Sequence, residues 1–201
     1  MKSYVKLGTG LLLGTAMLSG VSALRADDKA ETKPAESKPA ESSKIDLKLF
    51  AKDAQWKFAK NTGDGSFELS TDGETPIGVL KFDFTNSKAQ STPYVLAITT
   101  VNIAESKGDF TFSARSEVVK RITMRLVDDG GQTLQTKAQI PASGKWEPVK
   151  IPLTKKFEHW DGANDGKIHF PIKSFVISIP LPNEDAKTGK IEFSNATVVN
   201  K

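Results

Sequence analysis

Apolar and polar side chains alternate along most of the chain beyond residue 45. In one stretch Ile122, Met124 and Leu126 are separated by polar residues, which is the pattern of a strand with one buried face. Trp56 and Phe58 show the same spacing in the first candidate strand. The alternation predicts further strands over residues 77–84, 94–101, 109–114, 121–127, 132–140, 146–153, 172–179 and 190–199.

Turn-forming residues separate the predicted strands. Asp128-Asp129-Gly130-Gly131 predicts a tight hairpin turn, because Asp and Gly tolerate positive φ. Similar turn signals occur at Gly63-Asp64-Gly65, Asp72-Gly73, Ser143-Gly144 and Thr188-Gly189. Helical periodicity does not persist beyond about ten residues after the N-terminal segment. Eight or nine strands at this spacing predict an all-β fold, a two-sheet antiparallel β-sandwich.

The first 23 residues have the composition of a secretory signal peptide. Two lysines precede an apolar stretch over residues 7–21, and Val21-Ser22-Ala23 offers small residues for cleavage. A cut after Ala26 is an alternative, and an anchor that is never removed is another. The apolar stretch is shorter than the roughly 20 residues that span a bilayer. We therefore expect a secreted or periplasmic protein without a membrane span after cleavage.

Residues 27–44 read DDKAETKPAESKPAESSK, with KPAES present twice and no large apolar side chain. Such a segment cannot bury enough apolar surface to offset the entropy of ordering, so it is expected to be a disordered linker. The segment could serve as a tether for the domain or could be a processing remnant without a role, and both alternatives stay open. The β-sandwich domain is expected to occupy residues 45–201.

The charge of the chain depends on where it is counted. The 28 basic residues include three in the first 26 residues, where no acidic residue occurs, so the chain from Asp27 has 28 − 3 = 25 basic against 24 acidic side chains. A nearly neutral chain gives no electrostatic reason to expect nucleic acid as a partner. The chain has no Cys, which excludes disulfides and lipid attachment through a cysteine.

The order of motifs from residue 50 to residue 200 carries a family resemblance. Its main segments are MRLVDDGGQ, GKWEPVKIPL, FVISIPLP and GKIEFSNATV. This order resembles the galactose-binding-like jelly-roll domains, in particular family 11 carbohydrate-binding modules and related non-catalytic domains of glycoside hydrolases. The resemblance implies a jelly roll and glycan binding. The domain associated with complex I assembly shares much of the same pattern, so the resemblance leaves the ligand open.

One position departs from the pattern of that family. The last strand of such domains commonly carries Asp after the Ile-x-Phe motif, where this chain has Asn195. If that carboxylate helps to hold a structural calcium in some relatives, Asn195 weakens the expectation here, because calcium favours several charged oxygen ligands. The segment Asp161-x-x-Asn164-Asp165-Gly166 lacks the spacing and the bidentate Glu of an EF-hand and is interpreted as a turn. No cofactor is predicted.

The longest turn-rich segment of the domain, residues 155–166, places an aromatic ring among polar groups. Sugar binding needs a flat apolar surface with planar polar groups beside it. The candidate ligand-binding residues are Trp160, His159, Asp161 and Asn164, with Tyr94 and Arg115 as weaker additions. The alternative is that Trp160 packs over the edge of the sandwich. Trp146 and Trp56 are expected to pack structurally.

No catalytic motif is found in the sequence. It lacks a Gly-x-Ser-x-Gly elbow, a His-Glu-x-x-His helix and a phosphate-binding glycine loop, and its two His are His159 and His169. Glu68 and Glu192 each stand alone in their strands, whereas a glycosidase needs paired carboxylates. We therefore expect a non-catalytic protein that binds a glycan. The competing hypothesis is a structural or protein-binding domain whose partner is a protein of the cell envelope.

Overall fold

The computed structural model describes residues 43–87, 93–180 and 186–199. The predicted signal peptide and nearly all of the predicted linker lie outside these residues. The described residues form twelve strands and no helix. None of them therefore forms a helix that could cross a membrane.

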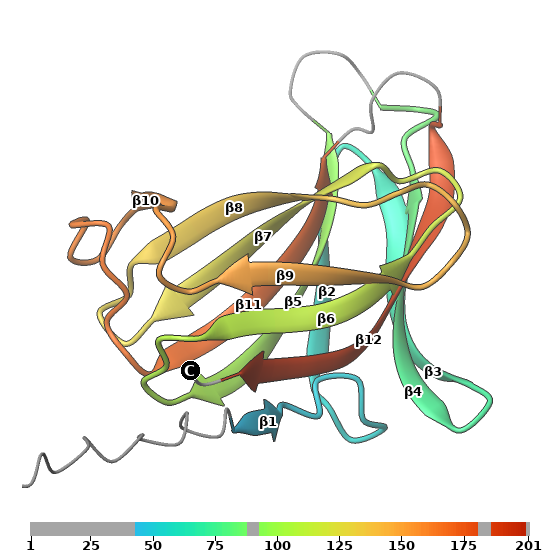
Figure 1. Cartoon of the computed structure of the whole chain (residues 1–201). Coiled ribbons are helices and arrows are strands. Elements are labelled where there is room, and N and C mark those ends of the chain that lie inside the picture. The colour runs from blue at the N-terminus through green and yellow to red at the C-terminus, as the bar shows by residue number, and fades with distance from the viewer. Residues whose placement is uncertain (1–42, 88–92, 181–185, 200–201) are drawn as a thin grey trace, which may run out of the picture. The chain divides into compact units, whose positions relative to one another are not determined.

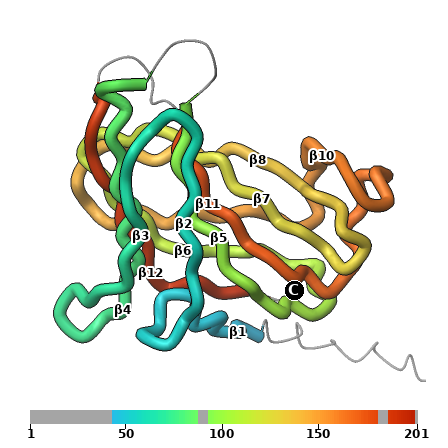
Figure 2. Tube along the Cα trace, turned by 180° about the vertical axis from the view of Figure 1, so that it is seen from behind, coloured from blue at the N-terminus to red at the C-terminus, as the bar shows by residue number. Residues whose placement is uncertain are grey.

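The strands form two antiparallel sheets, which confirms the predicted two-sheet β-sandwich. Sheet A contains β3 (Asp64–Asp72), β4 (Thr75–Asp83), β12 (Thr188–Val199), β6 (Asp109–Arg115) and β9 (Glu147–Pro152) in that order, with β1 (Lys44–Asp46) on β12. Sheet B contains β10 (Glu158–Trp160), β8 (Thr133–Gln139), β7 (Arg121–Asp128), β11 (Ile172–Pro180), β5 (Tyr94–Ile103) and β2 (Trp56–Asn61) in that order. Figure 1 shows β9, β6 and β12 in front of β11 and β5, and Figure 2 shows β2 and β11 from the other side.

Each long strand turns its apolar positions toward the space between the sheets. On β7, Ile122, Met124 and Leu126 are all buried, as the alternation predicted. Their sheet partner β11 contributes Phe175 and Ile177, each fully buried. The core therefore consists of the inward halves of both sheets, and the outward halves remain available for other roles.

Aromatic rings connect the two sheets at the centre of this core. Phe175 of sheet B lies 4.9 Å from Phe110 of sheet A, between ring centroids, and 6.4 Å from Phe112. Trp56 packs against Phe67 at 4.5 Å, and its indole nitrogen donates a hydrogen bond to the carbonyl of Leu49 at 2.7 Å. The predicted structural role of Trp56 is confirmed.

Three strands of the structure, β1, β3 and β10, were not predicted from the sequence. β3 begins at Asp64, inside the predicted turn Gly63-Asp64-Gly65, and its serines and acidic residues mask its alternation. β1 and β10 have three residues each, too few for a periodic pattern to show. β10 forms because it pairs with β8, which is a tertiary contact rather than a local preference.

Two turn features follow directly from residue type. The predicted turn at residues 128–131 joins β7 to β8, with Gly131 at φ 74°. In β12 the pairing with β6 shifts between Ser194 and Thr197, and Asn195 in this bulge has φ 53°. Asn tolerates the left-handed conformation better than most residues do, which gives Asn195 a backbone role that needs no metal.

We expect the substitution Asn195→Val to lower the free energy of unfolding by about 1–2 kcal/mol, because a β-branched residue is disfavoured at positive φ. Asn195→Gly serves as the control and should leave stability nearly unchanged. Thermal denaturation followed by circular dichroism measures both variants. Equal stability of the valine variant and the unmodified chain would show that the bulge can change its conformation.

Candidate functional site

The structure divides the predicted site residues among three places. His159 and Trp160 belong to β10 and are followed by Asp161 and Asn164, which are exposed. Tyr94 is the first residue of β5, which belongs to the same sheet. The turn-rich segment over residues 155–166 contains a strand that was not predicted, because β10 pairs with β8 and is held to the edge of sheet B. Arg115 lies on the other sheet.

The strand register shows which side chains point outward from sheet B. Outward residues of its six strands form rows across the sheet, and we call this outward surface the B face. One row consists of Glu158, Gln135, Arg125, Val176, Ile98 and Lys57. The row beside it consists of Trp160, Thr133, Val127, Ser174 and Thr100. Trp160 therefore lies on a sheet face and not at the tip of a loop.

Trp160 lies within a connected group of planar polar side chains. The guanidinium carbon of Arg125 is 5.5 Å from the centre of the Trp160 ring. Nε of Arg125 donates a hydrogen bond to Oε1 of Gln135 at 2.8 Å, and Nε2 of Gln135 donates one to Oε2 of Glu158 at 2.8 Å. These bonds orient three planar groups beside a half-buried ring. This combination of flat apolar surface and planar polar groups is suited to sugar rings.

Tyr94 is a second half-buried aromatic residue on the B face. It pairs with Asn61 on one side and Pro180 on the other. Four strand spacings of about 4.8 Å separate β10 from β5, so Trp160 and Tyr94 lie at least about 19 Å apart. The two rings cannot contact one sugar ring, but both can contact a chain of several.

His159 points the opposite way from Trp160, because neighbouring residues of a strand alternate. It pairs with Leu134, which is fully buried, and its ring lies against Gly166. Asp161 has φ 59° and Asn164 has φ 49°, so both shape the turns that follow β10. The structure thus places Trp160 on the B face, with His159 directed behind it and the two turn residues beside it.

A buried glutamine holds the segment that follows Trp160. Gln132 has no exposed surface. Its Oε1 accepts a hydrogen bond from the Gly166 amide at 3.0 Å, and its Nε2 donates to the Lys167 carbonyl at 2.7 Å. The carboxylate of Asp128 accepts hydrogen bonds from the amides of Gln132 and His169, both at 2.9 Å. The hairpin turn between β7 and β8 thereby fixes residues 166–169.

Sequence reasoning did not identify Gln132 as part of the site. The sequence shows only that a long polar residue directly follows the Asp-Asp-Gly-Gly turn. Strand alternation does not predict which distant backbone groups such a side chain would bond. Gly162 is equally constrained, because a Cβ there would lie 2.3 Å from the Gln132 amide nitrogen. The contact explains why glycine occupies this turn.

Arg115 lies on the outward face of sheet A, within a separate network. Its Nε donates a hydrogen bond to Glu192, and its Nη1 is 2.9 Å from Oδ2 of Asp72. The guanidinium carbon lies 4.6 Å from the centre of the Trp146 ring, whose nitrogen donates to Asp72 at 3.2 Å. Trp146 is therefore half-buried in this network and does not belong to the core.

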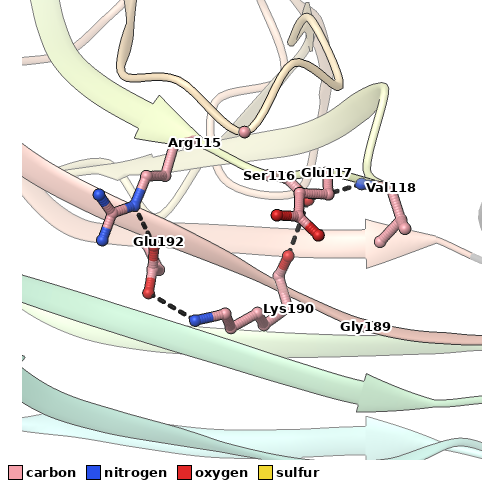
Figure 3. A pocket seen from close by; sticks show the side chains of 8 residues that line it. Arg115, Ser116, Glu117, Val118, Gly189, Lys190 and Glu192 are labelled. Carbon is pink, nitrogen blue, oxygen red and sulfur yellow. Dashed lines mark hydrogen bonds and ion pairs between the residues drawn. The ribbon is translucent and has the colours of Figure 1, made fainter.

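A pocket of about 340 Å³ lies beside this network (Figure 3). It is lined by Arg115, Ser116, Glu117, Val118, Gly144, Gly189, Lys190 and Glu192. Figure 3 shows Glu192 between Arg115 and Lys190, bonded to both, and the distance from Oε1 of Glu192 to Nζ of Lys190 is 2.9 Å. Glu192 thus pairs with both cations that line the pocket, and none of the lining residues is aromatic.

Glu192 is a nearly buried carboxylate, 7% exposed. Burial alone would raise its pKa, but the hydrogen bonds from Arg115 and Lys190 outweigh burial and hold the pKa below its ordinary value. The hydrogen bond with Glu192 is also the main reason that the pKa of Arg115 is raised. The ion pair is therefore a structural element that joins β6 to β12.

Metal binding has no visible support in the described residues. No group of three or more His, Asp or Glu side chains there could hold a metal ion. In the segment after β10, Oδ1 of Asp165 accepts a hydrogen bond from the amide of Lys167 at 2.9 Å and lies 3.1 Å from Nε2 of His169. These contacts are consistent with the interpretation of this segment as a turn.

The comparisons with known proteins identify the fold. No family model matches the sequence, and no curated protein matches it. The structure is similar to a family 11 carbohydrate-binding module from Clostridium thermocellum in complex with a β-1,3-1,4-mixed-linked tetrasaccharide. That match has a TM-score of 0.60 and 13% identity, and it covers 81% of this chain and 98% of the module.

A second structure, the family 11 module of the cellulosomal cellulase Lic26A-Cel5E of Clostridium thermocellum, matches with a TM-score of 0.57 and 12% identity over 82% of this chain and 97% of the module. The described residues therefore have the jelly-roll fold of carbohydrate-binding modules. The predicted resemblance to family 11 modules is confirmed at the level of the fold.

We expect Gln132→Leu to lower the free energy of unfolding by about 2 kcal/mol, because the partly buried Gly166 amide and the Lys167 carbonyl lose their bonds to the fully buried Gln132 side chain. Hydrogen exchange of the Gly166 amide should accelerate in this variant. The matched control is Gln139→Leu, an exposed position at the far end of β8, which should change stability by less than about 0.5 kcal/mol. Slow exchange of Gly166 in the Gln132 variant would contradict the role of this side chain.

The lowered pKa of Glu192 predicts a pH dependence. A carboxylate whose pKa is lower in the folded state stabilises the fold above its unfolded pKa of about 4.3 and loses that contribution as the pH falls through the folded value. We expect Glu192→Gln to reduce stability at pH 7 and to flatten the decline of stability below about pH 4.5. Denaturant titrations at several pH values measure this, with Glu74→Gln, at an exposed position of the β3–β4 turn, as control. Parallel pH profiles for both variants would contradict the prediction.

Proposed function

We propose that this protein is an exported, non-catalytic, carbohydrate-binding-module-like protein that binds a glycan on the B face. The observation that carries the proposal is the pair of half-buried aromatic residues, Trp160 and Tyr94, on one outward sheet face. Two aromatics on one face distinguish a glycan-binding surface from a scaffold whose aromatics are all in the core. The fold, shared with a module in complex with a tetrasaccharide, supports the proposal.

Binding at this face requires stacking and hydrogen bonds but no chemical step. The ring of Trp160 contacts the CH side of a sugar ring, while Arg125, Gln135 and Glu158 hydrogen-bond to its hydroxyls. The bonds from Arg125 to Gln135 and from Gln135 to Glu158 already orient these groups, so little side-chain entropy remains to be lost on binding. Tyr94 contacts a more distant unit of the same chain.

Both the sequence and the residues of the B face support a protein that binds a glycan without cleaving it. In the part of the chain that the structure describes, the outward strand positions of sheet B carry one carboxylate, Glu158. Hydrolysis of a glycosidic bond usually needs a pair of carboxylates at a defined separation. One carboxylate that is hydrogen-bonded to Gln135 serves recognition instead.

Export is also part of the proposal. The positively charged start, the apolar stretch over residues 7–21 and the small residues before position 24 support secretion or delivery to the periplasm.

We expect Trp160→Ala to weaken binding of the full chain to its polysaccharide by at least about tenfold, because the sugar loses its stacking surface. Affinity gel electrophoresis against a panel of polysaccharides measures the change. Trp146→Ala is the matched control, since Trp146 is also half-buried near an arginine but lies on the other sheet. It should leave binding within about twofold.

Two outcomes would overturn this proposal. If the chain binds no polysaccharide in the panel, the protein-binding alternative replaces it. If Trp146→Ala abolishes binding and Trp160→Ala does not, the site lies on the outward face of sheet A. Circular dichroism of both variants verifies that each remains folded.

A further inference from the structure

The two outward faces of the sandwich differ in how their charges are compensated. On sheet A four cations each lie 2.9–3.0 Å from a carboxylate. The pairs are Lys81 with Glu68, Arg115 with Asp72, Lys150 with Asp109, and Lys190 with Glu192. Each of these four cations therefore has a carboxylate partner at short range.

The B face is not compensated in this way. Its outward rows contain Arg125, Lys137 and Lys57 but only one carboxylate, Glu158. Glu158 lies 3.8 Å from Lys137 and is also bonded to Gln135. Arg121 points the same way and has an interaction of its own. Among the described residues, Arg125 and Lys57 have no carboxylate partner.

Arg125 retains most of its hydrogen-bonding capacity. Toward the described residues Arg125 donates a hydrogen bond through Nε alone, and the acceptor is the neutral amide of Gln135. The two terminal nitrogens carry four N–H groups, which can bind two oxygens of one anionic group in parallel. Val176 and Ile98 continue the same row, and such apolar neighbours lower the local dielectric and strengthen a charged contact.

We infer that the glycan bound on the B face is acidic, with carboxylate or sulfate groups on its sugar units. In this arrangement a sugar ring lies on Trp160, and its anionic group accepts two hydrogen bonds from the terminal nitrogens of Arg125. Lys57, at the other edge of the sheet, attracts a further anionic unit of the same chain. The inference rests on the proposed function and names the class of its ligand.

The test compares three polysaccharides with the purified full chain. Polygalacturonate carries carboxylates, a sulfated galactan carries sulfate esters, and a mixed-linked β-glucan is neutral. Binding to at least one acidic polymer should exceed binding to the neutral glucan by about tenfold at low salt and should weaken strongly at about 0.5 M NaCl. Preference for the first or the second polymer identifies the anionic group.

Matched charge variants connect this preference to the B face. Arg125→Gln should weaken acidic binding by roughly ten- to hundredfold, because a bidentate charged contact is lost. Lys57→Gln should weaken it by about threefold. Lys81→Gln removes the same charge from the outward face of sheet A and should leave binding within about twofold.

The outcomes separate the two proposals. Salt-independent binding of the neutral glucan that Trp160→Ala abolishes would overturn the acidic ligand and leave the proposed function intact. Binding of no polymer would overturn both. Equal binding of duplex DNA and of the acidic polymers would show a general polyanion surface and overturn a saccharide-specific site. Equal losses in Arg125→Gln and Lys81→Gln would show that the preference does not arise on the B face.

Discussion

The contact between Phe175 and Phe110 is the interaction on which the rest of the structure depends. Phe175 lies on a central strand of sheet B and Phe110 on a strand of sheet A, and both are fully buried. Their rings, 4.9 Å apart, join the two sheets at the middle of the core. Because interiors are close-packed, this contact sets the separation of the sheets. Once the inward residues are placed, the alternation of each strand decides which residues point outward.

The outward residues make two chemically different surfaces from one scaffold. On sheet A the charged side chains pair with one another, and the pair of Arg115 with Glu192 ties β6 to β12. On sheet B an aromatic ring lies beside Arg125, whose charge no described carboxylate compensates. A surface that satisfies its own charges contributes to stability, whereas a surface with spare hydrogen-bonding groups is suited to a ligand. The proposed function is thereby assigned to the B face alone.

The B face also depends on a contact behind it. Trp160 lies on a three-residue edge strand, which is too short to be stable by itself. Gln132 links the β7–β8 turn to the segment that follows this strand, through the Gly166 amide and the Lys167 carbonyl. The position of the aromatic ring thus relies on a polar side chain of the turn as well as on pairing with β8.

The alternation of residues such as Ile122, Met124 and Leu126 was sufficient to predict a two-sheet sandwich, since strand burial depends on a local period of two. Trp160 could be proposed from its neighbours, but its grouping with Arg125 and Gln135 could not, because these residues lie on different strands. Arg115 was a weaker candidate from the sequence, and its position on β6 places it on the other sheet, where it pairs with Asp72 and Glu192. Sequence by itself determined which residues face inward. Tertiary structure decided which outward residues meet, since strand order depends on contacts between residues distant in the chain.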